Sequence, residues 1–234
     1  MAKVNSQIWG GYFRDEADSA IDAVTTLAYD AVSSGTASGA TTITVAHTCV
    51  VAGSNLSLLV GVTASSTVAD ANRVPSGVTY DGVAMTNVGQ VINGNVGTSI
   101  WARGGVPGGG PYNIIATFAA SFADCVMGGV SFTGAHQTTA SLTGTFASAT
   151  GSSVSPSVAA AVGPKGIVLG VVGLLANTTF TAGTGETERW DAASAATTAV
   201  TGWGGTQLPV GGDSSITIAP TAAATGVWAI AAVE

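Results

Sequence analysis

The chain has 234 residues, of which 46% are hydrophobic and 8% are charged, whereas soluble domains average about 25% charged residues. Its 33 glycines and 7 prolines are too few to suggest a disordered chain. The net charge of -7 argues against a nucleic-acid partner, because such a surface needs clustered Lys and Arg. These figures predict a folded, glycine-rich and weakly charged protein.

Residues 1–24 differ from the rest of the sequence. Five of the 13 acidic residues fall in the first 30 positions, and three aromatic residues, Trp9, Tyr12 and Phe13, lie close together. We interpret this segment as an extended N-terminal arm with one or two helical turns; a short helix capped by Asp15 is the alternative. The arm leads into a first strand at residues 25–32, so we expect two parts, the arm and a single β-sandwich domain at residues 25–234.

From residue 36 onward the pattern is typical of β-structure. Residues 41–50 alternate, with Ile43, Val45, His47 and Cys49 on one face. The strongest hairpin signal is Asp81-Gly82 between residues 77–80 and 83–88, because Asp-Gly supplies the positive φ angles of a type I′ turn. Further strands are predicted at residues 56–63, 98–102, 112–119, 125–133, 154–160, 166–175, 187–191, 199–203, 214–219 and 227–233.

Many short strands at regular spacing, with almost no helical periodicity, predict an all-β fold: an antiparallel, jelly-roll-like β-sandwich. No internal repeat stands out in the sequence. Residues 166–175 and 227–233 are apolar on both faces, although one face of each strand in such a sandwich normally meets water. We therefore expect a second cover, either a loop, the arm or a neighbouring subunit, and a protein that lives in an assembly. The alternative is a neutral but hydrated surface of Gly, Ala, Ser and Thr.

Export and membrane signals are weak. No apolar stretch follows Lys3, so we expect no secretory signal peptide. The longest apolar stretch, residues 158–175, is interrupted by Gly163, Pro164 and Lys165, so we expect no membrane-spanning helix. The two cysteines are too few for a disulfide scaffold, and we expect two reduced, buried thiols, with a single disulfide as the alternative.

Candidate catalytic and metal sites have simpler structural interpretations. Four residues, His47, Cys49, Cys125 and His136, are of zinc-ligand type, but their spacing matches no zinc motif. A His136–Asp124 pair has no Gly-x-Ser-x-Gly nucleophile turn to serve. Calcium could bind near Asp70 and Asn72 or near Asp213, but each loop offers too few oxygen ligands. We therefore predict no catalytic residue, no metal and no cofactor.

Acidic and aromatic residues form two further candidate sites. Glu186 and Glu188, with Asp191, could form the carboxylate pair of a glycosidase, but a solvated strand end with one ion pair to Arg189 is the interpretation we favour. Sugar binding needs exposed aromatic rings. The candidates, which we expect to lie mainly in the core, are Trp101, Tyr112, Trp190, Trp203 and Trp228.

Several segments together resemble a widespread β-sandwich module of bacteriophage virion proteins and some bacterial surface proteins. They are residues 41–48, 55–62, 78–86 (VTYDGVAMT), 100–102 (IWA), 129–137 (GVSFTGAHQ) and 227–233 (VWAIAAV). The resemblance spans about residues 26–234. This chain departs from it at Ala102-Arg103, where a Tyr-Leu-type pair is common, and at His136, where Asp is usual.

The resemblance implies a non-enzymatic structural protein of a bacteriophage particle, foremost a capsid decoration (cement) protein that forms a symmetric homo-oligomer such as a trimer. Trp9, Tyr12 and Phe13 of the arm would dock on the major capsid protein or another virion protein, or exchange between subunits. Assembly would take place in the host cytoplasm and the mature location would be the virion. The alternative is a head or tail fibre component, or a bacterial surface adhesin that binds surface glycans.

Overall fold

A computed structural model describes residues 27–49, 55–68, 72–135, 137, 146–163, 166–194, 199–210 and 213–234. This part of the chain is all-β with antiparallel pairing, which confirms the predicted all-β, antiparallel class. None of its segments forms a helix of the length and apolarity that a bilayer crossing requires. The predicted arm, including Trp9, Tyr12 and Phe13, lies outside the described residues.

The first half of the chain forms two sheets. Sheet A has the strand order β1-β9-β3-β7-β6, and sheet B has the order β2-β8-β4-β5. Their bounds are β1 Ala28–Ser38, β2 Thr42–Cys49, β3 Ser57–Ser65, β4 Gly77–Tyr80, β5 Val83–Ala84, β6 Thr86–Asn93, β7 Val96–Gly104, β8 Gly109–Thr117 and β9 Asp124–Thr133.

The second half forms one large sheet and two small ones. Sheet C has the order β10-β18-β12-β15-β14, and the outer pairs are β11–β16 and β13–β17. Their bounds are β10 Ala147–Gly151, β11 Val158–Ala161, β12 Val168–Leu174, β13 Phe180–Thr181, β14 Thr187–Ala193, β15 Thr201–Gln207, β16 Ser215–Ile218, β17 Thr221–Ala222 and β18 Trp228–Val233.

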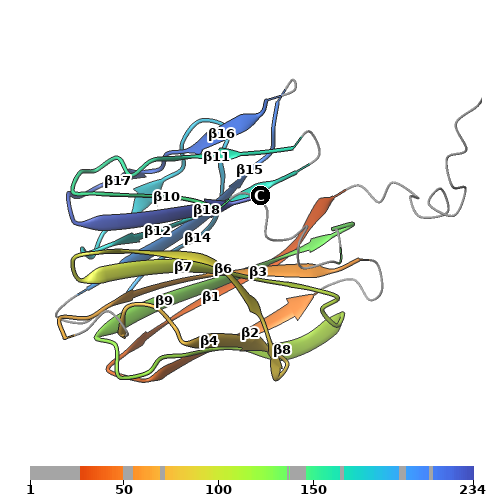
Figure 1. Ribbon diagram of the computed structural model, residues 1–234, viewed down its shortest axis with the longest axis horizontal. Coiled ribbons are helices and arrows are strands. Elements are labelled where there is room, and N and C mark those ends of the chain that lie inside the picture. Colours follow the sequence, from red (N-terminus) through yellow and green to blue (C-terminus); the bar gives the residue numbers. More distant parts are fainter. Residues whose placement is uncertain are drawn as a thin grey trace, which may run out of the picture.

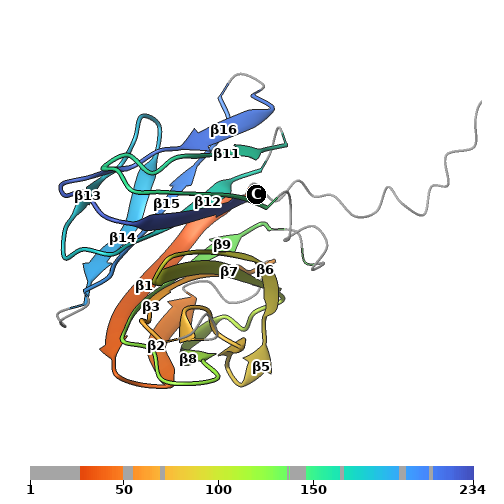
Figure 2. The same cartoon turned by 60° about the vertical axis from the view of Figure 1, so that its left-hand side comes forward.

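The sheets stack in layers, with sheets A and C inside and sheet B and the outer pairs at the two ends (Figures 1 and 2). Three apolar clusters fill the spaces between them. Core 1 lies between sheets A and B and includes Leu58, Val60 and Ile114. Core 2 lies between sheets A and C, and core 3 lies between sheet C and the outer pairs. The stack therefore has more layers than a two-sheet sandwich.

This stacking explains the strands that are apolar on both faces. In β12, Val171 enters core 2 while its neighbour Val172 enters core 3. In β18, Ala229 and Ile230 divide in the same way. The second cover is another sheet of the same chain, so the expectation that a loop, the arm or a neighbouring subunit covers these strands is wrong.

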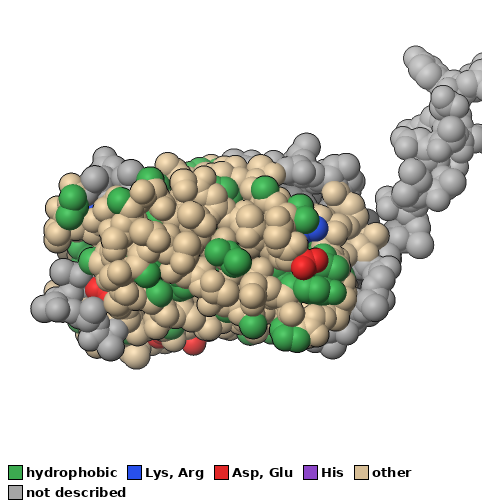
Figure 3. All heavy atoms as spheres, turned by 90° about the horizontal axis from the view of Figure 1, so that it is seen from below, with side chains coloured by type: hydrophobic (Ala, Val, Ile, Leu, Met, Phe, Trp, Pro, Cys, Tyr) green, Lys and Arg blue, Asp and Glu red, His purple; other side chains and the backbone are tan. Residues whose placement is uncertain are grey.

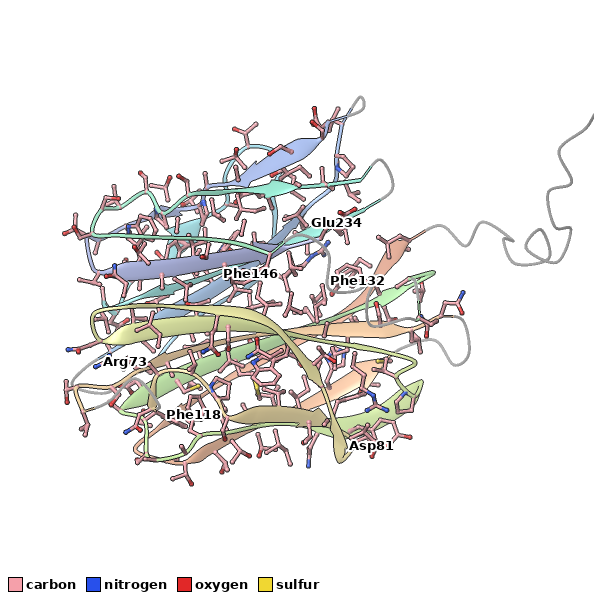
Figure 4. The ribbon with its side chains drawn as sticks, viewed as in Figure 1. Arg73, Asp81, Phe118, Phe132, Phe146 and Glu234 are labelled. Carbon is pink, nitrogen blue, oxygen red and sulfur yellow. The ribbon has the colours of Figure 1, made fainter. Side chains whose placement is uncertain are left out.

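The labelled aromatic residues in Figure 4 illustrate the layers. Phe132, from β9, is fully buried in core 2, and Phe146, just before β10, packs against the same cluster. Phe118 lies lower in the view, inside core 1, where its ring meets the ring of Phe122 edge-on at 4.8 Å between centroids. Each half of the chain thus has its own core, and core 2 joins the halves.

Local sequence signals account for several elements. The inward face of β2 carries the four residues predicted for it, with exposed residues in between. Asp81 and Gly82 have φ angles of 52° and 71°, as the predicted hairpin turn requires. The strand predicted at residues 83–88 instead breaks at Met85, whose amide donates to the carbonyl of Val78, and the chain then crosses from sheet B to sheet A.

Candidate functional site

A buried polar cluster is centred on His47 in β2, between sheets A and B. Its side chain is 1% exposed. Nδ1 of the imidazole lies 2.9 Å from the hydroxyl of Ser33 in β1, and Nε2 lies 3.1 Å from the hydroxyl of Ser131 in β9. The Ser131 hydroxyl in turn donates to a carboxylate oxygen of Asp30 at 2.7 Å. We call these four residues the His47 network.

The network fixes the proton positions on the imidazole. Burial lowers the pKa of His47, while the negative charge of Asp30 acts in the opposite direction, so a neutral ring is favoured. A neutral imidazole has one donor and one acceptor nitrogen. Because the Ser131 hydroxyl gives its proton to Asp30, its oxygen accepts from Nε2–H, and Nδ1 accepts from the hydroxyl of Ser33.

The strand register brings these residues together. Ser131 pairs with Ala31 in the β1–β9 ladder, next to Asp30, and Ser33 pairs with Gly129 in the same ladder. His47 faces inward because residues of β2 alternate between core and solvent. The network therefore connects β1 and β9 of sheet A to β2 of sheet B, and it can hold a proton and polarise the Ser33 hydroxyl.

Two neighbouring groups extend the cluster into core 1. The Sγ atom of Cys49 lies 3.7 Å from the hydroxyl of Tyr80, and that hydroxyl donates to the carbonyl of His47 at 3.4 Å. Burial raises the pKa of the Cys49 thiol and that of the Tyr80 phenol, so both stay protonated at neutral pH. Cys49 and Cys125 are both free and buried, which confirms the predicted pair of reduced thiols.

The suggested zinc ligands do not come together in the part that the structure describes. His47 and Cys49 are held in the hydrogen bonds above, Cys125 is fully buried in core 1, and His136 lies outside the described residues. Among the described residues there is no group of three or more His, Cys, Asp or Glu side chains that could hold a metal ion. Asp70 also lies outside them, and the amide of Asn72 donates to the carbonyl of Ser121.

The acidic cluster of the sequence binds structural donors. The Glu186 carboxylate accepts hydrogen bonds from the backbone amides of Gly183 and Ala219. One oxygen of Glu188 accepts from the indole N–H of Trp203 at 3.2 Å. These carboxylates hold neighbouring strands and turns in place, a role that the sequence pattern did not reveal.

Asp191 and Arg189 complete this region. Burial raises the pKa of Asp191, the amide of Phe180 opposes this by donating at 2.7 Å, and the negative charge of Glu188 adds to the rise. Arg189 donates to the hydroxyl of Thr206 and lies over the ring of Tyr29, 4.0 Å from its centroid. The interaction that we expected for Arg189, an ion pair, is thus replaced by a hydrogen bond and a cation–π contact.

The described tryptophans are core residues. Trp101 lies in core 1, Trp190 in core 2, and Trp203 and Trp228 in core 3, all at most 7% exposed. They offer no open ring face on which a sugar could stack. Tyr112 is half-buried and packs edge-on against Tyr80.

A shallow pocket of about 330 Å³ lies where the two halves meet. Hydroxyl and amide groups of Ser65, Ser66, Thr67 and Asn95 line one side, and Leu175, Ala176 and Ala199 line the other. The lining is uncharged. It belongs to the ends of β3 and β12 and the loops beside them, apart from the His47 network.

The outward face of sheet B is polar but weakly charged. Thr42, Thr44 and Thr48 point outward from β2 and are exposed. Figure 3, which views the end of the stack that sheet B forms, shows scattered hydrophobic side chains and few charged ones. Few large hydrophobic residues of the described part are exposed, for example Val68, Val83 and Leu208, an ordinary feature of protein surfaces.

Comparison with known proteins gives no relative from which to transfer a function: no family model, no curated protein and no solved structure matches the chain.

Proposed function

We propose that this chain is a non-enzymatic structural protein of a bacteriophage particle, foremost a capsid decoration protein that forms a symmetric oligomer. The observation that carries the proposal is the distribution of polar and apolar surface. The broad apolar sheet faces are buried in the three cores. The exterior of sheet B is rich in hydroxyl groups and poor in charge. A body whose apolar sheet faces are covered and whose exterior carries few charges suits a protein that covers a surface.

The hydrogen bonding of the acidic side chains and of His47 supports the same proposal. The carboxylates of Glu186, Glu188 and Asp191 accept structural hydrogen bonds, and the imidazole of His47 is enclosed between two sheets. The hydrogen bonds of these side chains stabilise the stack. The resemblance of residues 26–234 to a module of virion proteins gives the proposal its particular setting.

Attachment is assigned to the arm at residues 1–24. Core 2 is closed within the chain, so the sheet faces that we first expected to meet other subunits are already covered. The aromatic residues Trp9, Tyr12 and Phe13 are the largest apolar side chains of the arm, and burial of each against a partner would contribute about 1.5–3 kcal/mol. We propose that they dock on the major capsid protein.

Particle binding tests this function. Particles that lack the protein are incubated with the full chain, sedimented, and assayed for bound copies. The triple variant Trp9→Ala, Tyr12→Ala and Phe13→Ala is expected to lose attachment while its circular dichroism stays unchanged. The matched control is Val210→Ala, which removes an exposed hydrophobic side chain from the body.

Each result has a clear meaning. Full attachment by the triple variant would overturn the role of the arm, and failure of the unaltered protein to copurify with virions would overturn the function. Strong binding to a glycan array without binding to shells would favour the alternative, a fibre component or surface adhesin.

A further inference from the structure

The two halves of the chain repeat one strand topology. Sheet A runs β1-β9-β3-β7-β6, and sheet C runs β10-β18-β12-β15-β14. In each sheet, the first and last strands of that half of the chain lie side by side. The third strand follows them, and then come the two strands of a later hairpin. The outer layers correspond as well, because β2 pairs with β8 as β11 pairs with β16, and β4 pairs with β8 as β13 pairs with β17.

The correspondence extends to the residue register. Val60 of β3 lies opposite Trp101 of β7. Val172 of β12 lies opposite Trp203 of β15 in the same way. Each tryptophan is buried in the core of its own half, Trp101 in core 1 and Trp203 in core 3. The edge strands β6 and β14, which flank the tryptophan strands, each carry a register shift.

The contact between the halves has the form of a twofold interface. The edge strand β1 lies against β14, and its counterpart β10 lies against β6, the counterpart of β14. Likewise β12 lies against β7 and β3 against β15, while the central strands β3 and β12 face each other. Exchanging every strand for its counterpart reproduces the same set of neighbours, which is the property of an isologous interface.

Equivalent residues also line both sides of core 2. The register aligns Leu59 with Val171 and Gly61 with Gly173. A side chain at Gly61 would meet Val171 at 2.6 Å, and one at Gly173 would meet Thr63 at 2.2 Å. Each central strand thus carries a glycine at the aligned position, where a side chain would collide with the other sheet.

We infer that the chain is an internal duplication: two copies of one eight-strand unit, residues 28–133 and 147–233, each with its own core, bound to each other as a pseudo-twofold dimer. Each unit docks through the face of its larger sheet that lines core 2. Its partner is the equivalent face of the other copy. The short strand β5 is an addition in the first unit, and in the second unit β16 and β17 together take the place of β8.

Polar contacts at the rim and within the interface fix this docking. The side-chain amide of Asn93, at the end of β6, donates to the carbonyls of Gly151 and Trp228, both at 3.0 Å. The hydroxyl of Thr98 donates to the carbonyl of Ala229 at 3.2 Å. Each of these bonds joins the first unit to the second, so core 2 is a specific interface with satisfied polar groups.

Cutting the connection between the units tests whether they are separate bodies. A protease site is inserted into the full chain between residues 137 and 146, and the purified protein is cleaved. The two fragments are expected to stay folded and to co-elute at the 22.7 kDa size of the intact chain. Separation or precipitation of the fragments at micromolar concentration would overturn the inference.

A variant at the interface tests how the fragments bind. In the cleavable protein, Gly128→Leu places a side chain into the ring of Trp190, whose atoms lie 2.3 Å from a Cβ built at Gly128. Association of the fragments is expected to weaken at least about tenfold, equivalent to about 1.4 kcal/mol. The matched control is Gly77→Leu, where a Cβ meets nothing within 4 Å. Equal association of the two variants would contradict the assigned interface.

Hydrogen exchange in the uncleaved chain provides an independent measurement. Ile114→Ala opens core 1, and Ile218→Ala opens core 3. The first variant is expected to accelerate amide exchange within residues 28–133, and the second within residues 147–233. Acceleration spread evenly over both units by either variant would show a single cooperative body and overturn the inference.

Discussion

His47 shows how burial sets the proton state of a side chain here. In the unfolded chain its pKa is near the ordinary value of 6.5, and in the fold burial lowers it. As the pH falls below 6.5, the unfolded chain binds a proton that the folded chain does not. The free energy of unfolding therefore decreases with falling pH, and this contribution is fully present only above pH 6.5.

We predict that His47→Gln removes this part of the pH dependence. Urea unfolding of the unaltered protein should show a free energy of unfolding that falls between pH 7 and pH 5, by up to about 1.4 kcal/mol per pH unit for one proton. The variant should be less stable at pH 7, because the His47 network is broken, but its slope should be smaller. The control is His136→Gln, since the chain has only two histidines. Identical slopes for the two variants would refute the assignment.

At the residue scale, the sequence located side chains better than it located their partners. Alternation in residues 41–50 correctly placed His47 and Cys49 in the core. It could not reveal that Ser131, 84 positions later, would meet the imidazole. That contact depends on the pairing of β9 with β1, and local periodicity carries no information on which strands become neighbours.

Glu186 stabilises the junction of several elements at one end of the second unit. Its carboxylate accepts from the amide of Gly183, in the turn before β14, and from that of Ala219, just after β16. Loss of the carboxylate leaves two partly buried backbone donors without an acceptor, and each unsatisfied buried donor costs about 1–3 kcal/mol.

We therefore predict that Glu186→Ala lowers the free energy of unfolding by about 2 kcal/mol. The control is Asp213→Ala, whose carboxylate accepts from the amide of Val210 in an exposed loop. That variant should change stability by less than about 0.5 kcal/mol. Urea denaturation followed by tryptophan fluorescence measures both, and equal effects would contradict the structural role of Glu186.

Strand prediction succeeded where the local sequence pattern was strong. It failed where a strand forms only because a neighbouring strand pairs with it. The hairpin at Asp81-Gly82 was predictable because its turn chemistry is local. The first strand was predicted to end at residue 32, yet residues 33–38 form the second half of β1 and pair with β9. Strand β10, with the sequence ASATG, was missed for the same reason: it exists because β18 offers it a ladder.

At the scale of the whole molecule, the low charge predicts weak sensitivity to salt. Only 8% of residues are charged, and screening acts mainly on exposed charges. Raising sodium chloride from about 10 mM to about 150 mM shortens the screening length from about 30 Å to about 8 Å. The free energy of unfolding should change by less than about 0.5 kcal/mol, as thermal or urea unfolding can measure; a larger change would show that a few charges dominate stability.

The duplication was the feature least accessible from the sequence. Aligned pairs such as Trp101 with Trp203 and Gly61 with Gly173 are scattered, while most equivalent positions differ in type, as Gly129 and Ile230 do. Apolar character on both faces of a strand correctly signalled a second cover. It could not distinguish a foreign subunit from the other half of the same chain, because both supply the same kind of contact.

The central position of β18 has a consequence for synthesis. Strand β18 lies between β10 and β12, so sheet C stays split until residues 228–233 have emerged from the ribosome. The first unit can close as soon as residue 133 is free, and its apolar sheet then waits for the later strands. A nascent chain halted before residue 228 would leave the apolar face of sheet A exposed, where chaperones would bind it.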